Sequence, residues 1–344
     1  MDALTDRPVS LPPLRERSAM PAHAPLAMPA QSLRRWSEAE RRPLRAPELW
    51  RTPWFSRALA FGGMTAITGT GSWQMYKVVE AGGVTLLEWA FLVFFVVNFS
   101  WIALAFTTGL LGLGHLLRHG LNRKPELPAA LRERTAVVMP IYNESPARVF
   151  GTVQAIAEDV AATGHGASFD FFFLSDTTDP DIWIAEERAF LALRERLPEM
   201  GIHYRHRPKN TARKAGNIAD FVTHWGGNYA HMLVLDADSL MTGETIVALA
   251  DAMERDPDAG IIQTLPRLIN RNTVIARLQQ FAARVYGPVV AAGLAVWSGR
   301  DGNYWGHNAI IRMEAFATSA GLPDLPGKPP FGGHILSHDF VEAG

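Results

Sequence analysis

Two aspartates separated by one alanine form the strongest candidate for chemistry in this sequence of 344 residues. Asp236 and Asp238 directly follow the apolar run 231–235, which is typical of a buried strand. On an extended segment, the side chains at i and i+2 project to the same side. Two carboxylates in this arrangement can hold Mg²⁺ or Mn²⁺ and leave coordination sites open for a diphosphate. This spacing is common by chance, so its place at a strand end is what makes it a candidate metal site.

Three further polar motifs lie at the ends of predicted elements. Tyr142, in Met-Pro-Ile-Tyr-Asn-Glu, follows the first predicted strand and offers a flat face to a base. Asp176, in Ser-Asp-Thr-Thr-Asp, follows the second, where a turn or a helix N-cap is the alternative interpretation. Arg213 and Lys214 lie near a predicted helix start, where basic side chains suit a phosphate group. A solvated basic turn is the alternative for that pair.

The C-terminal part of the chain carries two more polar motifs. The segment 303–308 contains Trp305 and His307 and mixes aromatic with hydrogen-bonding groups, as sugar sites do. Further on, His334 and His338 have a spacing found in zinc sites. The Gly- and Pro-rich stretch 329–333 argues against one helix holding both histidines, and no third ligand is evident. Zinc is therefore not favoured.

Alternating strand and helix patterns must position these motifs. Short apolar runs predict strands at 135–139, 169–174, 202–204, 231–235 and 260–264. Helical patterns lie between them at 146–162, 181–197, 211–225 and 242–255. This alternation predicts an α/β domain with a mostly parallel sheet covered by helices. Ligands in such domains bind at the carboxyl ends of the strands, where the polar motifs fall.

A further helix is predicted at 273–292. Its apolar residues share one face, with Arg277 and Arg284 elsewhere on the helix. The pattern fits a helix lying on a membrane surface and equally a helix packed on the sheet.

Two uncharged runs precede the α/β domain. The first lies between Arg57 and Lys77, and the second spans 89–117. Because about 20 helical residues cross a bilayer, we predict two transmembrane helices within 53–118, with buried core helices as the alternative. Basic residues gather outside both runs: Arg41, Arg42, Arg45, Arg51, Arg57, Arg118, Arg123, Lys124, Arg132 and Arg134. This bias predicts a multi-pass protein with both ends of the hairpin in the cytoplasm.

Composition limits the remaining choices. Residues 1–52 are rich in Pro, Ala and Arg and are predicted to form a disordered cytoplasmic tail, leaving 119–344 for the α/β domain. The net charge of −1 gives no electrostatic reason to expect a nucleic-acid partner. The chain has no cysteine, which excludes disulfides, zinc–thiolate sites and cysteine nucleophiles.

The order of these motifs resembles that of the processive family 2 glycosyltransferases, such as cellulose and hyaluronan synthases. The resemblance runs from Arg134 to the end of the chain. It is closest to bacterial members that build the backbone of osmoregulated periplasmic glucans. The motifs that carry it are Pro-x-Tyr-Asn-Glu, Ser-Asp-Thr-Thr-Asp, Arg-Lys-Ala-Gly-Asn, Asp-Ala-Asp-Ser, Gly-His-Asn-Ala and Ser-His-Asp-Phe.

The resemblance implies a GT-A fold, an inverting mechanism, UDP-glucose as donor and a growing β-glucan as acceptor. It also implies a place in the bacterial inner membrane in contact with lipid, a cytoplasmic catalytic domain, and acyl carrier protein as a further partner. In its terms Tyr142, Asp176 and Lys214 line the nucleoside end of the site. Asp236 and Asp238 manage the diphosphate and the metal, with Asp238 the more direct ligand.

The same resemblance assigns the acceptor side. Asp339 takes the place of the general base, and Trp305 and His307 lie near the acceptor. Two departures stand out. The last motif is Ser-His-Asp where many members have Thr-Glu-Asp, and no Gln-x-x-Arg-Trp motif follows before Gly344. We therefore expect the chain to be incomplete at its C-terminus relative to the family.

Other functions remain open on the sequence alone. A transferase of similar fold that attaches one sugar to a polyprenyl phosphate is the nearest alternative. A catalytically impaired membrane scaffold is another, given the missing motif. A nicotinamide enzyme is set aside because no Gly-x-Gly-x-x-Gly turn follows the first strand.

Overall fold

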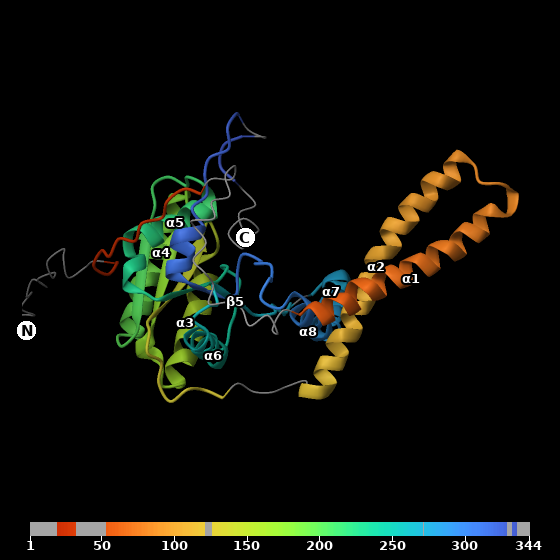
Figure 1. Cartoon of the computed structure of the whole chain (residues 1–344). Helices are drawn as coiled ribbons and strands as arrows, with labels where there is room; N and C mark the ends of the chain where they lie inside the picture. Colours follow the sequence, from red (N-terminus) through yellow and green to blue (C-terminus); the bar gives the residue numbers. More distant parts are fainter. Residues whose placement is uncertain (1–18, 32–52, 121–125, 271, 329–331, 336–344) are drawn as a thin grey trace, which may run out of the picture.

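The computed structural model describes residues 19–31, 53–120, 126–270, 272–328 and 332–335. An α/β domain holds the sheet, and a long hairpin of two helices extends away from it (Figure 1). Within the described residues, the motifs around Tyr142, Asp176, Lys214, Asp236 and His307 all belong to the α/β domain.

The sheet has six strands in the order β3-β2-β1-β4-β6-β5. The strands are β1 (Thr135–Ile141), β2 (Phe169–Ser175), β3 (Gly201–His206), β4 (His231–Val234), β5 (Ile261–Gln263) and β6 (Ala309–Arg312). β1 to β4 pair in parallel, whereas β6 lies antiparallel between β4 and β5. The predicted mostly parallel α/β sheet is confirmed, and β6 is an additional strand that the sequence reasoning missed.

Helices cover both faces of the sheet. They are α3 (Pro146–Ala162), α4 (Pro180–Arg196), α5 (Arg213–Trp225), α6 (Gly243–Arg255) and α9 (Met313–Ser319). Side chains of a strand alternate between its two faces, so Val137 packs with α3, α4 and α6, while Val138 packs with α5 and α9. Both valines are buried, which explains why the run at β1 is almost continuously apolar.

The hairpin consists of α1 (Trp54–Val79) and α2 (Leu86–His119), joined through the short 3-10 helix η4 (Glu80–Gly82). Thr85 and Glu88 form a capping box that starts α2. Within the described residues, α2 is the single helix long and apolar enough to cross a membrane, with a mean hydropathy of 2.1. α1 has the predicted length but not the hydropathy, because its glycines and polar residues dilute the apolar side chains. Of the two predicted spans, one is therefore a candidate in the structure.

The helix predicted at 273–292 is broken into two. α7 (Val274–Val285) and α8 (Gly287–Ser298) meet at Tyr286 with a bend of 49°. Pro288 starts α8, and its missing N–H and bulky ring favour a new helix over continuation of the old one. Taken together as one bent span, the two helices are also long and apolar enough to cross a membrane.

α8 packs on the hairpin rather than on the sheet. A Cβ atom added at Gly112 of α2 would collide with the carbonyl oxygen of Val289, and one at Gly293 with that of Thr108. The two backbones thus approach closely at paired glycines. Arg57 of α1 donates to the carbonyl oxygen of Trp297 at 2.9 Å, which places a cation at the C-terminal end of α8. The hairpin and the α/β domain are joined through this insertion between β5 and β6.

An N-terminal segment lies along the α/β domain as well. Residues 19–31, inside the predicted disordered tail, run beside α5 (red in Figure 1). Ala19 accepts the backbone N–H of Tyr204 at 3.0 Å, and Pro21 accepts the indole N–H of Trp225 at 3.2 Å. This stretch is therefore ordered, because its carbonyl groups and apolar side chains find partners on the domain. Residues 1–18 and 32–52 lie outside the described part of the chain.

Candidate active site

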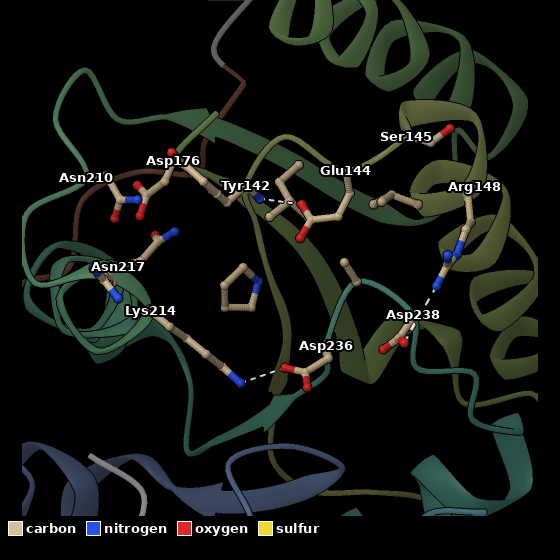
Figure 2. A pocket seen from close by; sticks show the side chains of 15 residues that line it. Tyr142, Glu144, Ser145, Arg148, Asp176, Asn210, Lys214, Asn217, Asp236 and Asp238 are labelled. Carbon is tan, nitrogen blue, oxygen red and sulfur yellow. Dashed lines mark hydrogen bonds and ion pairs between the residues drawn. The ribbon is translucent and has the colours of Figure 1, made fainter. Parts of the chain in front are cut away.

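A cavity of about 770 Å³ lies at the carboxyl ends of β1, β2 and β4, beside the start of α5 (Figure 2). The parallel strands bring their polar ends to one edge of the sheet, as this architecture dictates. Six residues singled out in the sequence line the cavity: Tyr142, Asp176, Arg213, Lys214, Asp236 and Asp238. They come from four separate segments, so the fold brings together the motifs that the sequence presents apart.

Lys214 and Asp236 form an ion pair in the cavity. The Nζ atom of Lys214 donates to Oδ1 of Asp236 at 2.6 Å and to the carbonyl oxygen of Gly306 at 2.7 Å. His307 lies on the other side of the same carboxylate, with Nε2 3.9 Å from Oδ2 of Asp236. The Asp236 carboxylate thus lies between two basic side chains from distant parts of the chain.

Asp238 is the more open of the two carboxylates. Its side chain is 59 % exposed, and its nearest cation is Arg148, with Nη2 3.6 Å from Oδ2. Ser239 fixes the turn, since its N–H donates to the carbonyl oxygen of Asp236 at 2.9 Å. Figure 2 shows both carboxylates at the cavity edge formed by the end of β4.

These two carboxylates fit a divalent cation that prefers oxygen ligands. In the described ranges, no group of three or more His, Cys, Asp or Glu side chains is arranged to hold a metal. A Mg²⁺ or Mn²⁺ ion at Asp236 and Asp238 would therefore complete its coordination with oxygens of a bound diphosphate and water. Such a site would form together with its ligand.

The opposite side of the cavity holds Asp176. Its carboxylate is buried and accepts two hydrogen bonds from Arg207, at 2.8 Å from Nε and 2.7 Å from Nη2. This bidentate geometry fixes the plane of the carboxylate. Arg207 belongs to the basic stretch after β3, and the sequence reasoning gave it no role. Tyr142 lies nearby with its ring about half exposed at the cavity.

Asn143 joins the loops that carry Tyr142 and Asp176. Its backbone is left-handed, with φ of 59°, a conformation that asparagine tolerates better than most residues. Its side-chain oxygen accepts the N–H groups of Thr178 and Asp179 at 3.0 and 3.2 Å. The ends of β1 and β2, which both line the cavity, are thereby tied to each other.

Glu144 is a cavity residue to which the sequence reasoning assigned no role. The N–H of Tyr142 donates to its carboxylate, and partial burial raises the pKa of Glu144, with smaller contributions from nearby carboxylates. Arg148, Asn210 and Asn217 also line the cavity and were not singled out. Asn217 is the last residue of the Arg-Lys-Ala-Gly-Asn motif, whereas Arg148 and Asn210 are signalled only by their position close to a helix start.

The predicted acceptor residues lie beside the cavity rather than among its lining residues. The backbone N–H of Trp305 donates to Oε1 of Gln263 at 2.7 Å, and the indole side chain is partly exposed. His307 reaches the cavity through Asp236, as described above. Of the histidine pair considered for zinc, His334 contacts Asp324 at 2.6 Å. The predicted base Asp339, like His338, falls outside the residues that the structure describes.

Comparison with known proteins identifies the family. The profile of Glycosyl transferase family 2 matches residues 136–319. "Glucans biosynthesis glucosyltransferase H" of Shewanella baltica (strain OS185) is 54 % identical over 327 residues, covering 95 % of this chain and 45 % of the relative. The protein of the same name from Shewanella oneidensis is 53 % identical over 329 residues, with the same coverage. The chain thus spans less than half the length of these curated relatives.

Solved structures show weaker similarity. The mannosyltransferase PcManGT from Pyrobaculum calidifontis, in complex with GDP-Man and Mn²⁺, has a TM-score of 0.41 and 18 % identity, covering 62 % of this chain and 55 % of that one. The mannosyltransferase Ktr4p from S. cerevisiae has a TM-score of 0.36 and 9 % identity, covering 63 % and 67 %. Similarity at this level bears on neither substrate nor metal.

Proposed function

The chain belongs to glycosyltransferase family 2, and from that premise we propose that it transfers glucose from UDP-glucose onto a growing periplasmic β-glucan at the bacterial inner membrane. The observation that supports this most is the cavity in which two strand-end aspartates face a lysine and a helix start. The names of the relatives support a glucan as product. Because the chain covers 45 % of those relatives, the reaction of the whole protein is part of the proposal.

We infer that Asp236 and Asp238 hold Mg²⁺ or Mn²⁺ when the donor binds. The ion supplies charge stabilisation for the diphosphate oxygens. Asp238 is open to solvent and makes one long ion pair, so its oxygens are available as ligands. Asp236 keeps Lys214 in the cavity, where the lysine can turn from the carboxylate to a phosphate oxygen.

The proposed reaction is a single in-line displacement with inversion at the anomeric carbon. A bond forms from the acceptor oxygen to that carbon as the bond from the carbon to the UDP oxygen breaks. Arg213 and Lys214, at the start of α5, stabilise the negative charge that develops on departing UDP. Asp339 removes the proton of the acceptor hydroxyl, a role assigned from its motif in the sequence.

The nucleoside is proposed to bind at the ends of β1 and β2. The half-exposed ring of Tyr142 offers a stacking face, and the fixed carboxylate of Asp176 offers an acceptor for a donor group of the base. Trp305 and His307, on the other side of Asp236, are proposed to contact the acceptor sugar. The GT-A type of fold is part of this proposal.

Exposed apolar surface supports membrane association. α2 is long and apolar enough to cross a membrane, and α7 exposes a row of large apolar side chains: Val274, Ile275, Leu278, Phe281 and Val285. None of the α7 residues is buried, so the helix is not packed on the sheet. We propose that α2 spans the inner membrane with α1 as its partner, that α7 lies at the lipid surface, and that the α/β domain is cytoplasmic.

The proposal is tested by following the label of UDP-[¹⁴C]glucose in membranes that contain the chain. Label in a water-soluble or precipitable glucan supports it. Label that extracts into chloroform–methanol would identify a lipid-directed transferase instead. Binding of UDP-glucose without transfer to either product would indicate an impaired scaffold and contradict the proposed reaction for this length of chain.

A further inference from the structure

Glu186 is a buried carboxylate on α4 that lies outside the lining of the cavity. The residue is 1 % exposed, and a charge so placed is costly unless it is hydrogen-bonded. Three hydroxyl groups donate to it: Ser175 at 2.7 Å, Thr177 at 2.6 Å and Tyr204 at 2.9 Å. The carboxylate therefore gathers donors from the end of β2, the loop after it, and β3.

Two of these hydroxyls also accept a hydrogen bond from a backbone N–H group. While Thr177 donates its proton to Glu186, its oxygen accepts the N–H of Asn143 at 3.1 Å. Ser175 likewise donates to Glu186 and accepts the N–H of Thr177 at 3.2 Å. A hydroxyl has one proton, so committing it to the carboxylate turns the lone pairs toward these N–H groups. The carboxylate thus decides the direction of both hydrogen bonds.

The residues held in this way belong to the donor side of the cavity. Asp176 lies between Ser175 and Thr177, so both of its neighbours are fixed to Glu186. Asn143 directly follows Tyr142 and holds a left-handed backbone that needs support from its surroundings. Glu186 is hydrogen-bonded to neither Tyr142 nor Asp176, and it is linked to the loop of each through Ser175 and Thr177.

We propose that Glu186 is a positioning residue for the nucleotide donor, and that its carboxylate, through Ser175 and Thr177, holds the ends of β1 and β2 in the conformation that binds the nucleoside. This inference rests on the proposed function for the identity of the donor. It predicts that the affinity for the nucleotide sugar depends on a side chain that the nucleotide sugar does not contact.

The first test compares Glu186→Gln with Glu187→Gln. The amide keeps the shape but replaces one acceptor oxygen by a donor, which opposes the hydroxyl protons of Ser175 and Thr177. We expect Glu186→Gln to weaken UDP-glucose binding, measured by calorimetry with Mg²⁺ on the detergent-solubilised chain, by about tenfold or more. Glu187 is exposed on the same helix, and Glu187→Gln should bind as the native chain does.

The second test separates positioning from general stability. Tyr204 donates to the same carboxylate from within β3 rather than from either loop, so Tyr204→Phe should lower the unfolding temperature and leave donor affinity nearly unchanged. Thr177→Val should weaken donor binding, and Thr177→Ser, which keeps the hydroxyl, should restore it. If affinity instead follows the unfolding temperature across all these variants, Glu186 is a structural residue and the inference is overturned.

The third readout needs no nucleotide. Hydrogen exchange of peptides covering 141–145 and 176–180 should accelerate in Glu186→Gln and in Thr177→Val, and should be unchanged in Glu187→Gln. A native chain that binds no UDP-glucose would refute the proposed donor, while the exchange data would still decide whether Glu186 holds the loops. Native affinity or native exchange in Glu186→Gln would overturn the inference. If Glu186→Gln fails to fold, the comparison of Thr177→Val with Thr177→Ser tests the same inference.

Discussion

Lys214 Nζ lies 2.6 Å from Oδ1 of Asp236, so a cation suited to phosphate is paired with a carboxylate suited to a metal. The two residues are on α5 and at the end of β4, and neither is fully buried. A partly exposed pair of this kind contributes about 1 kcal/mol or less to stability. It can therefore open when a divalent ion takes the carboxylate and a diphosphate takes the ammonium group.

This relationship predicts the behaviour of Lys214→Gln. Donor affinity should fall about tenfold, because a charged hydrogen bond to the diphosphate is lost. Binding of Mn²⁺ at saturating UDP, followed by electron paramagnetic resonance, should be unchanged or slightly stronger, because Asp236 loses its competing cation. Lys209→Gln, an exposed lysine nearby, is the matched control. Loss of Mn²⁺ binding in Lys214→Gln would show that the lysine supports the metal site rather than competing with it.

Asp339 can be tested apart from the donor site. If it is the general base, Asp339→Asn should leave UDP-glucose binding close to native and lower glucan synthesis by about 10²–10⁴-fold. The measurement is synthesis against affinity on the same preparation. Full synthesis by the variant would remove Asp339 as the base, and lost donor binding would place it among the donor residues.

His231 predicts how stability depends on pH. Burial, with a smaller contribution from Arg312, lowers the pKa of His231 to about 4. An unfolded histidine titrates near 6.5, so below that pH the unfolded chain binds the extra proton and the folded chain does not. The stabilising contribution is complete above pH 6.5 and is lost as the pH falls from 6.5 toward 4, by up to about 3 kcal/mol.

The check is thermal unfolding at pH 7.5 and pH 5. His231→Gln should be less sensitive to this change of pH than the native chain. His119→Gln, at an exposed histidine at the end of α2, should keep the native sensitivity. Equal sensitivity in all three proteins would mean that His231 does not control acid stability.

The paired glycines predict that adding a side chain where α2 crosses α8 destabilises the protein. Gly112→Ala places a methyl group against the carbonyl oxygen of Val289 and should destabilise the detergent-solubilised chain by about 1–3 kcal/mol. Gly109→Ala lies on the same helix, where an added Cβ meets nothing within 4 Å, and should be neutral or slightly stabilising. Equal unfolding temperatures for the two variants would argue against the close crossing.

Much of the α/β domain could be predicted from the sequence because its local signals agree with the fold. The helix predicted at 146–162 has those same bounds as α3, since Pro146 starts it and its apolar residues repeat at helical spacing. The gathering of Tyr142, Asp176, Lys214 and Asp236 at one cavity followed from the rule that parallel strands end at the same edge.

Other features depend on contacts that no local pattern reveals. The apolar repeat continues through Tyr286, so the break before Pro288 was missed although proline favours a helix start. β6 has four residues and pairs antiparallel with β4, and so short a run resembles a loop. Glu186 has charged neighbours in the sequence of α4, where a glutamate ordinarily faces water. Its burial becomes evident from the hydroxyl groups that surround it in the fold.

The central claim, that this cavity binds a nucleotide sugar through a metal on Asp236 and Asp238, has one most direct test. It is the affinity for UDP-glucose with Mg²⁺, with Mn²⁺ and with chelator, on the native chain and on Asp238→Asn. We predict that chelator and Asp238→Asn each abolish metal-dependent binding, while Asp258→Asn, at an exposed aspartate, behaves as native. Equal affinity for UDP-glucose in chelator and in metal, or native metal-dependent binding by Asp238→Asn, would contradict the account.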